Sequence, residues 1–237
     1  MRDDDAPPVL TIDGPTASGK GTLARRVAQA LDFHILDSGA IYRAFALHAQ
    51  GAGVDPASAQ DNPALACALA LQLPLAFRDE QILLEGVDVS EAIRAERIGT
   101  LASEFSAQAA VRAGLLERQR AFCRMPGLVA DGRDMGTVVF PCARLKVFLV
   151  AGLEERARRR TKQLIEKGFS ATLKEVLSEL QARDARDRSR SLAPLEPAPG
   201  ALLLDGSMLS IEASVEQVLH WWSAVESPPA GVHDSRA

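Results

Sequence analysis

The chain has 237 residues, of which 47% are hydrophobic and 24% charged, and this composition suits one globular core. Its formal net charge of -4 argues against a nucleic-acid-binding protein that depends on phosphate contacts. No stretch reaches the roughly 20 apolar residues that cross a bilayer, and the N-terminus is acidic where a signal peptide is basic, so we expect a cytoplasmic protein without a membrane partner.

The first predicted unit is a strand, a glycine loop and a helix. Residues 8–13 are apolar enough for a buried strand, and an apolar stripe of Leu23, Val27 and Leu31 predicts the helix. Between them lies GPTASGKGT, a loop whose backbone N–H groups can surround phosphate oxygens while its lysine reaches the β- and γ-phosphates. The predicted nucleotide-binding residues of this loop are Gly14, Pro15, Thr16, Ala17, Ser18, Gly19, Lys20, Gly21 and Thr22.

The loop departs from the usual phosphate-loop pattern after its lysine. Gly21 stands where a Ser or Thr usually contacts the metal, and a threonine comes one position later. We therefore predict that Mg²⁺ is held mostly by phosphates and water, with no protein metal ligand. The alternative, a tight turn without a ligand, is disfavoured because the lysine and both flanking elements fit the motif. The loop alone does not separate a kinase from a GTPase or a motor.

The next elements are a short strand at 34–37 and a helix that Ser38 is placed to cap. The segment 65–98 breaks the alternation of strand and helix. Its apolar runs LPLAF and ILLEG, separated by RDEQ, predict a hairpin of antiparallel strands. We interpret this segment as an insertion on the core.

Three further runs predict buried strands, at 128–131, 145–150 and 201–205, and helical patterns separate them. Strands that alternate with helices indicate a parallel sheet with helices on both faces. The predicted fold is therefore an α/β phosphate-loop fold with five parallel strands and a small antiparallel insertion.

Charged residues follow two of these strands. Arg43 comes about one helical turn after the strand at 34–37. Asp131 ends the strand at 128–131, and Arg133 and Asp134 follow it. In open parallel sheets, ligands bind at the carboxyl ends of the strands. An ordinary polar surface turn is the alternative explanation for the charged triplet.

The segment 171–190 carries charge on a face that begins as apolar. Val176 and Leu180 lie on one helical stripe, and steps of three, four and three residues continue it to Arg183, Asp187 and Arg190. Charges directed inward are costly unless they are paired or bound to a ligand, so this face predicts an anion site. A solvated helix end with salt bridges is the alternative.

Five stretches together resemble the bacterial cytidylate kinases: IDGPTASGKGT, LDSGAIYRA, VRAGLLERQRAF, ADGRDMGTVVFP and RDARDRSR. They occur in the expected order and extend over roughly residues 9 to 220. The resemblance implies a core with a monophosphate-binding part and a mobile lid. The implied divisions are a core of 8–37, 127–152 and 200–226, a monophosphate-binding part of 38–126, a lid of about 153–170, a long helix of 171–190, and a flexible tail of 227–237. Two departures are Ala17, where the family often has glycine, and the tail.

The resemblance also implies roles for individual residues. The CMP phosphate is expected at Arg43, Arg133 and Arg190, with Ser38 in the same site. The cytosine edge is expected at Ser103, Arg112 and Asp134, and the ribose hydroxyls at Arg183 and Asp187. The lid arginines are expected to close on ATP; they are Arg156, Arg158, Arg159 and Arg160. The sequence does not select among the four, and Arg159 is taken as the representative ATP-binding residue. Lys20, Arg133 and Arg190 are the expected catalytic residues.

The implied reaction is phosphoryl transfer from ATP to CMP or dCMP. The acceptor phosphate has a second pKa of about 6, so it is largely ionised at neutral pH and needs no general base. This agrees with a motif set rich in arginine, with all four histidines outside it. We expect UMP to be a poor acceptor and the protein to be a monomer. Another small-molecule kinase, for example of shikimate or dephospho-coenzyme A, and a nucleotide-regulated binding module remain as alternatives.

Overall fold

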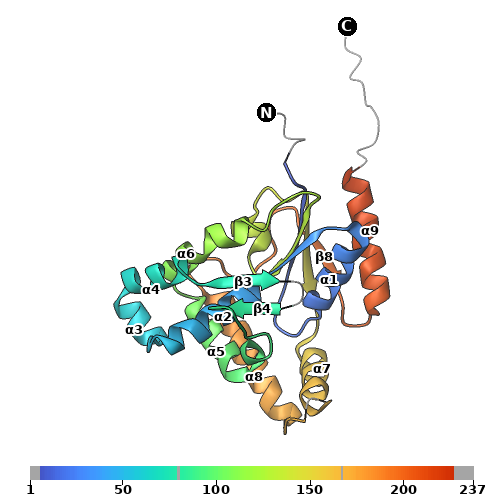
Figure 1. Cartoon of the computed structure of the whole chain (residues 1–237). Helices are drawn as coiled ribbons and strands as arrows, with labels where there is room; N and C mark the ends of the chain where they lie inside the picture. Colours follow the sequence, from blue (N-terminus) through green and yellow to red (C-terminus); the bar gives the residue numbers. More distant parts are fainter. Residues whose placement is uncertain (1–5, 79–80, 167, 227–237) are drawn as a thin grey trace.

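The computed structural model describes residues 6–78, 81–166 and 168–226, so the predicted tail of 227–237 lies outside the described residues. Its centre is a five-stranded parallel sheet (Figure 1). The strands, in spatial order, are β2 (His34–Asp37), β6 (Leu128–Gly132), β1 (Val9–Asp13), β7 (Leu145–Val150) and β8 (Leu202–Asp205). The five predicted strands and the predicted fold class are confirmed.

The two faces of this sheet are covered by different helices, as the alternation of side chains along each strand requires. On β6, Val129 packs in the cluster formed by α1 (Lys20–Leu31) and α9 (Ile211–Glu226). Its neighbours Leu128 and Ala130 pack in the larger cluster on the opposite face. That cluster is built by α2 (Ser38–Gly51), α5 (Glu96–Phe105) and α6 (Ala109–Arg120).

The segment predicted as an insertion contains more helix than expected. The hairpin is confirmed as β3 (Leu75–Arg78) and β4 (Gln81–Leu84), and β5 (Val87–Asp88) extends it to three antiparallel strands. Before it lie two short helices, α3 (Pro56–Asp61) and α4 (Pro63–Leu71), and after it one turn of 3₁₀ helix, η2 (Ala92–Arg94). Helix α4 packs against α6, so the start of the segment is helical core and only the rest is a small sheet.

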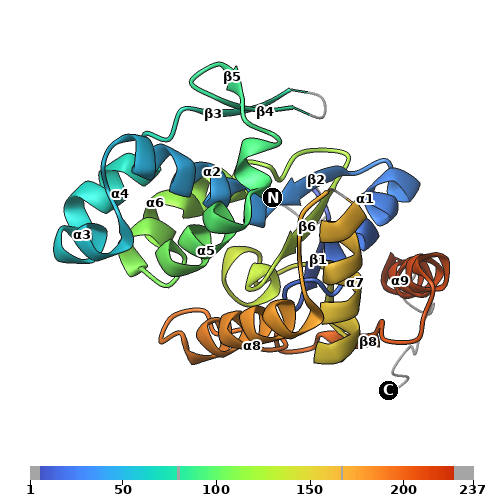
Figure 2. The same cartoon turned by 90° about the horizontal axis from the view of Figure 1, so that it is seen from below.

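Two helices extend from the carboxyl edge of the main sheet, α7 (Leu153–Glu166) and α8 (Leu173–Ser189). They pack against each other through Ala157, Val176 and Leu180. In Figure 2, α7 lies between the group α3–α6 on one side and α9 on the other, and α8 runs along the lower edge of that group. None of the helices in the described ranges is long and apolar enough to cross a membrane.

The register of the sheet brings several charged residues to one level. Asp131 is paired with Ile12 of β1 and with Asp37 of β2, so β1, β2 and β6 end together. After β6 the chain forms one turn of π-helix, η3 (Met135–Val139). Asp13 accepts hydrogen bonds from the backbone N–H groups of Met135 and Gly136, both at 2.8 Å, and so ties this turn to β1.

Candidate active site

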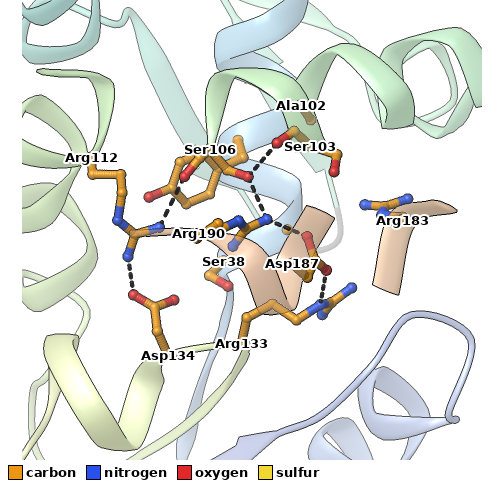
Figure 3. Close-up of a pocket in the computed structure, with 12 residues that line it drawn as sticks. Ser38, Ala102, Ser103, Ser106, Arg112, Arg133, Asp134, Arg183, Asp187 and Arg190 are labelled. Atoms are coloured by element: carbon orange, nitrogen blue, oxygen red, sulfur yellow. Dashed lines mark hydrogen bonds and ion pairs between the residues drawn. The ribbon is translucent and has the colours of Figure 1, made fainter. Parts of the chain in front are cut away.

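A polar pocket opens at the carboxyl ends of β2 and β6, between α2, α5, α6 and α8 (Figure 3). The empty space in the pocket, including the part that is open to solvent, is about 430 Å³. Its lining residues are Ser38, Gly39, Tyr42, Ala102, Ser103, Ser106, Arg112, Arg133, Asp134, Arg183, Asp187 and Arg190. Every residue predicted for the acceptor side lines this pocket, except Arg43.

One buried carboxylate organises the centre of the pocket. Arg133 donates from Nε to Asp187 Oδ2 at 3.1 Å, and Arg190 donates from Nη2 to Asp187 Oδ1. Burial alone would raise the pKa of Asp187, but Arg133, Arg190 and Arg183 lower it below its ordinary value. A single negative charge thus faces three guanidinium groups, and the surplus positive charge suits an anionic ligand.

Two of these guanidinium groups keep donors free. Among the described residues, the buried Nε atoms of Arg183 and Arg190 have no hydrogen-bond partner. Burial, followed by the neighbouring charge of Arg133, lowers the pKa of Arg183 to about 10. Buried donors without partners are costly, so a ligand that accepts from them stabilises the arrangement.

Arg43 lies beside the pocket and not in its lining. Its Nη1 donates to the backbone oxygen of Ile93 at 3.3 Å. A Cβ atom added to Gly99 would lie 3.4 Å from Arg43 Nη2 and 3.6 Å from Arg183 Nη1, so the two guanidinium groups are neighbours across Gly99 of α5. Arg43 is therefore next to Arg183, which lines the pocket, and belongs to the same cluster of arginines.

The opposite end of the pocket carries an ion pair, between Arg112 of α6 and Asp134 (Figure 3). Arg112 also donates from Nη1 to the backbone oxygen of Ser106 at 3.2 Å, which fixes its plane. The buried hydroxyl of Ser103 has no partner among the described residues. A carboxylate, a guanidinium and a free hydroxyl at one end give the pocket both acceptors and donors.

Ser38 does not cap α2, contrary to the sequence-based prediction. The cap is Asp37, whose side chain accepts from the N–H of Ala40 at 3.0 Å. The hydroxyl of Ser38 instead donates to the backbone oxygen of Asp131 at 2.8 Å and joins α2 to β6 at the pocket floor. Helix α2 begins at Ser38, one residue earlier than a serine cap requires, so Asp37 takes the capping position.

The glycine loop curls around Lys20, which is 7% exposed and donates to the backbone oxygen of Pro15 at 3.1 Å. Burial, followed by Arg133, lowers the pKa of Lys20 to about 7. Burial raises the pKa of Asp131 to about 6, although the nearby Lys20 opposes this shift. Ala17 has φ 60, a left-handed conformation that costs a non-glycine residue about 1–2 kcal/mol. The alanine at this position therefore strains the loop.

A second pocket, of about 610 Å³, lies on the other side of the glycine loop. Its lining residues are Ser18, Gly19, Thr22, Leu23, Leu149, Arg159, Gly206, Leu209, Ile211 and Ser214. Arg159 donates from Nη2 to the backbone oxygens of Gly206 at 2.9 Å and Ser207 at 3.2 Å. Apolar walls and one guanidinium beside a phosphate-binding loop suit a nucleoside.

The four lid arginines differ in their surroundings. Arg159 lines the second pocket, Arg158 is exposed on α7, and Arg160 pairs with Glu96 of α5. Arg156 is buried and pairs with Asp184 of α8. Geometry thus distinguishes the four, which the sequence left equivalent.

A family model described as cytidylate kinase matches residues 10–224 of the chain. The chain belongs to the cytidylate kinase family. Proteins described as cytidylate kinases from Chromobacterium violaceum, Burkholderia pseudomallei strain 1106a and Cupriavidus necator are 56%, 57% and 55% identical to it. The matches cover 91%, 93% and 92% of this chain and 95%, 95% and 96% of those proteins.

Among the residues of this cytidylate kinase family member that the sequence did not predict, Ser106 lines the first pocket and Asp184 holds Arg156 beside the glycine loop. Ser106 accepts from Arg190 with Oγ at 2.7 Å and from Arg112 with its backbone oxygen, so it connects the two ends of the pocket. Its spacing of three residues from Ser103 on one helix was the available signal. Asp184, which holds Arg156, carried no such signal, because its partner lies on another helix.

Proposed function

We propose that the protein transfers the γ-phosphoryl group of ATP to CMP or dCMP, with the acceptor in the first pocket and ATP over the glycine loop. One observation carries the proposal. Arg133 donates both to Asp187 in the acceptor pocket and to the hydroxyl of Thr16 in the glycine loop. Its positive charge therefore lies between the two sites, where the transferred group must pass.

The Arg112–Asp134 end of the pocket is proposed to read cytosine. A carboxylate can accept from the N4 amino group of cytosine, and a guanidinium can donate to N3 or O2. Uracil has a carbonyl at position 4, which would face the carboxylate of Asp134. Asp187 and Arg183 are proposed to hold the ribose, and Arg43, Arg133 and Arg190 the acceptor phosphate.

The chemistry proposed for these residues is electrostatic. Two polyanions must approach each other, and the arginines and Lys20 offset their repulsion and stabilise charge on the transferring group. Guanidinium groups stay charged and bind phosphate with two donors at once, which suits the acceptor side. Arg159 is proposed to contact ATP from the lid, and closure of the lid would exclude water.

The described residues fit Mg²⁺ through a single carboxylate. They contain no group of three side chains able to hold a metal ion, and Gly21 offers no hydroxyl. Asp131, however, has a buried Oδ1 without a partner, and its Oδ2 would lie 3.1 Å from a Cβ atom added to Gly21. We propose that Asp131 holds the ion, through water, against the phosphates of ATP. The ion would neutralise phosphate charge when bound.

The division into core, monophosphate-binding part and lid stays a prediction, and so does a cytoplasmic monomer. The pairing of Arg160 with Glu96 supports a lid that can reach the monophosphate-binding part. Light scattering of the purified protein tests the monomer.

A coupled assay of ADP release with CMP, dCMP, UMP, AMP, GMP and shikimate as acceptors tests the function. We expect fast release with CMP and dCMP and slow release with the others. Comparable efficiency with UMP would contradict the cytosine-reading scheme. Equal ATP loss with and without CMP would instead favour a nucleotide-regulated module, and a response to shikimate alone another small-molecule kinase.

A further inference from the structure

A buried ion pair joins the base of the lid helix to α8. Arg156 and Asp184 are 3% and 5% exposed. Their contact is double: Arg156 Nη1 lies 3.2 Å from Asp184 Oδ1, and Nη2 lies 2.5 Å from Oδ2. Removing two charges from water is costly, so a pair this deep needs further partners or a task beyond stability.

The same guanidinium holds the glycine loop. Arg156 Nη1 donates to the backbone oxygen of Thr16 at 3.0 Å, and Nε donates to the backbone oxygen of Ala151 at 3.0 Å. All three nitrogen atoms of Arg156 are therefore engaged by the protein. This arginine is anchored away from the second pocket, unlike Arg159.

Thr16 is held by two arginines that depend on one helix. Arg156 binds its carbonyl and is held by Asp184, while Arg133 binds its hydroxyl and is held by Asp187. Asp184 and Asp187 are three residues apart, so they lie on neighbouring positions of α8. Helix α8 also carries residues of the acceptor pocket. It thereby determines the position of the glycine loop relative to that pocket.

We infer that Arg156 and Asp184 are a positioning pair for phosphoryl transfer. They hold the glycine loop, at Thr16, in a fixed position relative to α8, the helix that carries residues of the acceptor pocket. The inference rests on the proposed function. Reaction rates depend steeply on the alignment of the reacting groups, and a displacement of about 1 Å can cost a factor on the order of 10². Loss of the pair should therefore lower turnover more than it weakens CMP binding.

The test replaces both partners at once, with Arg156→Met and Asp184→Leu. Apolar replacement of a complete buried pair is often neutral for stability, whereas removal of one partner leaves an unpaired charge. We expect the double variant to melt near the wild-type temperature and to bind CMP within twofold of wild type by calorimetry. Its kcat should fall on the order of 10- to 100-fold, because the carbonyl of Thr16 has lost its donor.

The matched control is the pair Arg26 and Glu212, which joins α1 to α9 at 2.6 Å on the exposed surface. The same exchange there, Arg26→Met with Glu212→Leu, should leave kcat unchanged. A second variant, Arg156→Lys, keeps the buried charge but cannot hold Thr16 and both carboxylate oxygens together. If the double variant fails to fold, the lysine variant tests the inference by the same three measurements: kcat, CMP affinity and melting temperature.

The outcomes separate a positioning role from a structural one. A double variant with wild-type kcat and wild-type thermal stability would overturn the inference. Equal losses in kcat and in CMP affinity would overturn it too. A low kcat with normal stability and CMP binding would support it. Failure of the proposed function itself would appear differently, as absence of CMP-dependent turnover in the wild-type protein.

Discussion

Lys20 is the residue whose charge depends most directly on the nucleotide. In the ligand-free protein burial and Arg133 lower its pKa to about 7, so at pH 8 its amine is largely neutral. Phosphates of ATP favour the charged form. We predict that ATP binding at pH 8 takes up a proton and that affinity falls as pH rises above 7. Calorimetry in two buffers of different ionisation enthalpy measures this uptake.

A Lys20→Arg variant supplies the control, because arginine stays charged throughout this range. It should abolish the part of the proton uptake that belongs to the side chain. Binding enthalpies of the wild-type protein that do not depend on the buffer would rule out the depressed pKa.

Asp134 gives a prediction about base choice. In Asp134→Asn an amide replaces the carboxylate, so the acceptor for the N4 amino group is weakened and a donor for uracil O4 is gained. We expect the ratio of kcat/KM for CMP over UMP to fall by a factor that corresponds to about 1–3 kcal/mol. An unchanged ratio in a variant with a wild-type melting temperature would show that this end of the pocket does not read the base.

Residues differ in how far the sequence could reveal them. Arg133 and Asp134 were predictable because a charged motif directly after a buried strand must lie at the sheet edge. The pairing of Arg156 with Asp184 was not, because it depends on how α7 packs on α8. The cap of α2 was assigned to the wrong residue for a smaller reason. Asp37 and Ser38 can both cap a helix, and only the residue at which the helix begins decides between them.

At the scale of elements, the contact between α4 and α6 requires a glycine. A Cβ atom added to Gly114 would lie 2.6 Å from Ala70 Cβ and 2.8 Å from the backbone oxygen of Cys67. Gly114→Ala should therefore force the two helices apart and lower the free energy of unfolding by about 1–3 kcal/mol. Chemical denaturation measures this change.

Gly51, at the end of α2, is the control for that substitution. An added Cβ atom there meets nothing within 4 Å, so Gly51→Ala should be neutral or slightly stabilising. Equal stabilities of the two variants would contradict the close approach of α4 and α6.

Helix α4 also shows where periodicity fails. Its sequence PALACALAL is apolar on every side, so no polar face separates a helix from a strand. The signals that identify it are at its start, where Asn62 accepts from the N–H of Leu65 and Pro63 occupies the first turn. The five core strands lacked this ambiguity because each apolar run is too short for a helix.

For the whole molecule, stability should depend on pH through three carboxyl groups. Burial raises the pKa of Asp13 to about 7 and of Asp131 to about 6, and a hydrogen bond to Glu96 followed by burial raises that of Glu179 to about 7. The folded protein thus binds more protons than the unfolded chain between about pH 4 and 7. The free energy of unfolding should fall as pH rises through this window.

Melting temperatures of the ligand-free protein between pH 5 and 7.5 measure the effect. Lys20 acts in the opposite direction, but only above about pH 7, where its lowered pKa lets stability rise again. In Glu179→Gln a neutral side chain replaces the protonated acid, so the slope below pH 7 should become shallower. A melting temperature that rises from pH 5 to 7.5 would contradict the assigned directions.

The guanidinium groups around Asp187 outnumber its single negative charge, and this affects the choice of salts in experiments. Sulfate, pyrophosphate and citrate carry the charge and oxygen geometry that these groups accept, so such salts will compete with CMP and inflate its apparent Michaelis constant. Crystals grown from ammonium sulfate should trap a tetrahedral mimic of the acceptor phosphate between Arg133 and Arg190. Kinetic work on this enzyme is therefore best done in chloride solutions, because acetate is also a carboxylate that guanidinium groups bind.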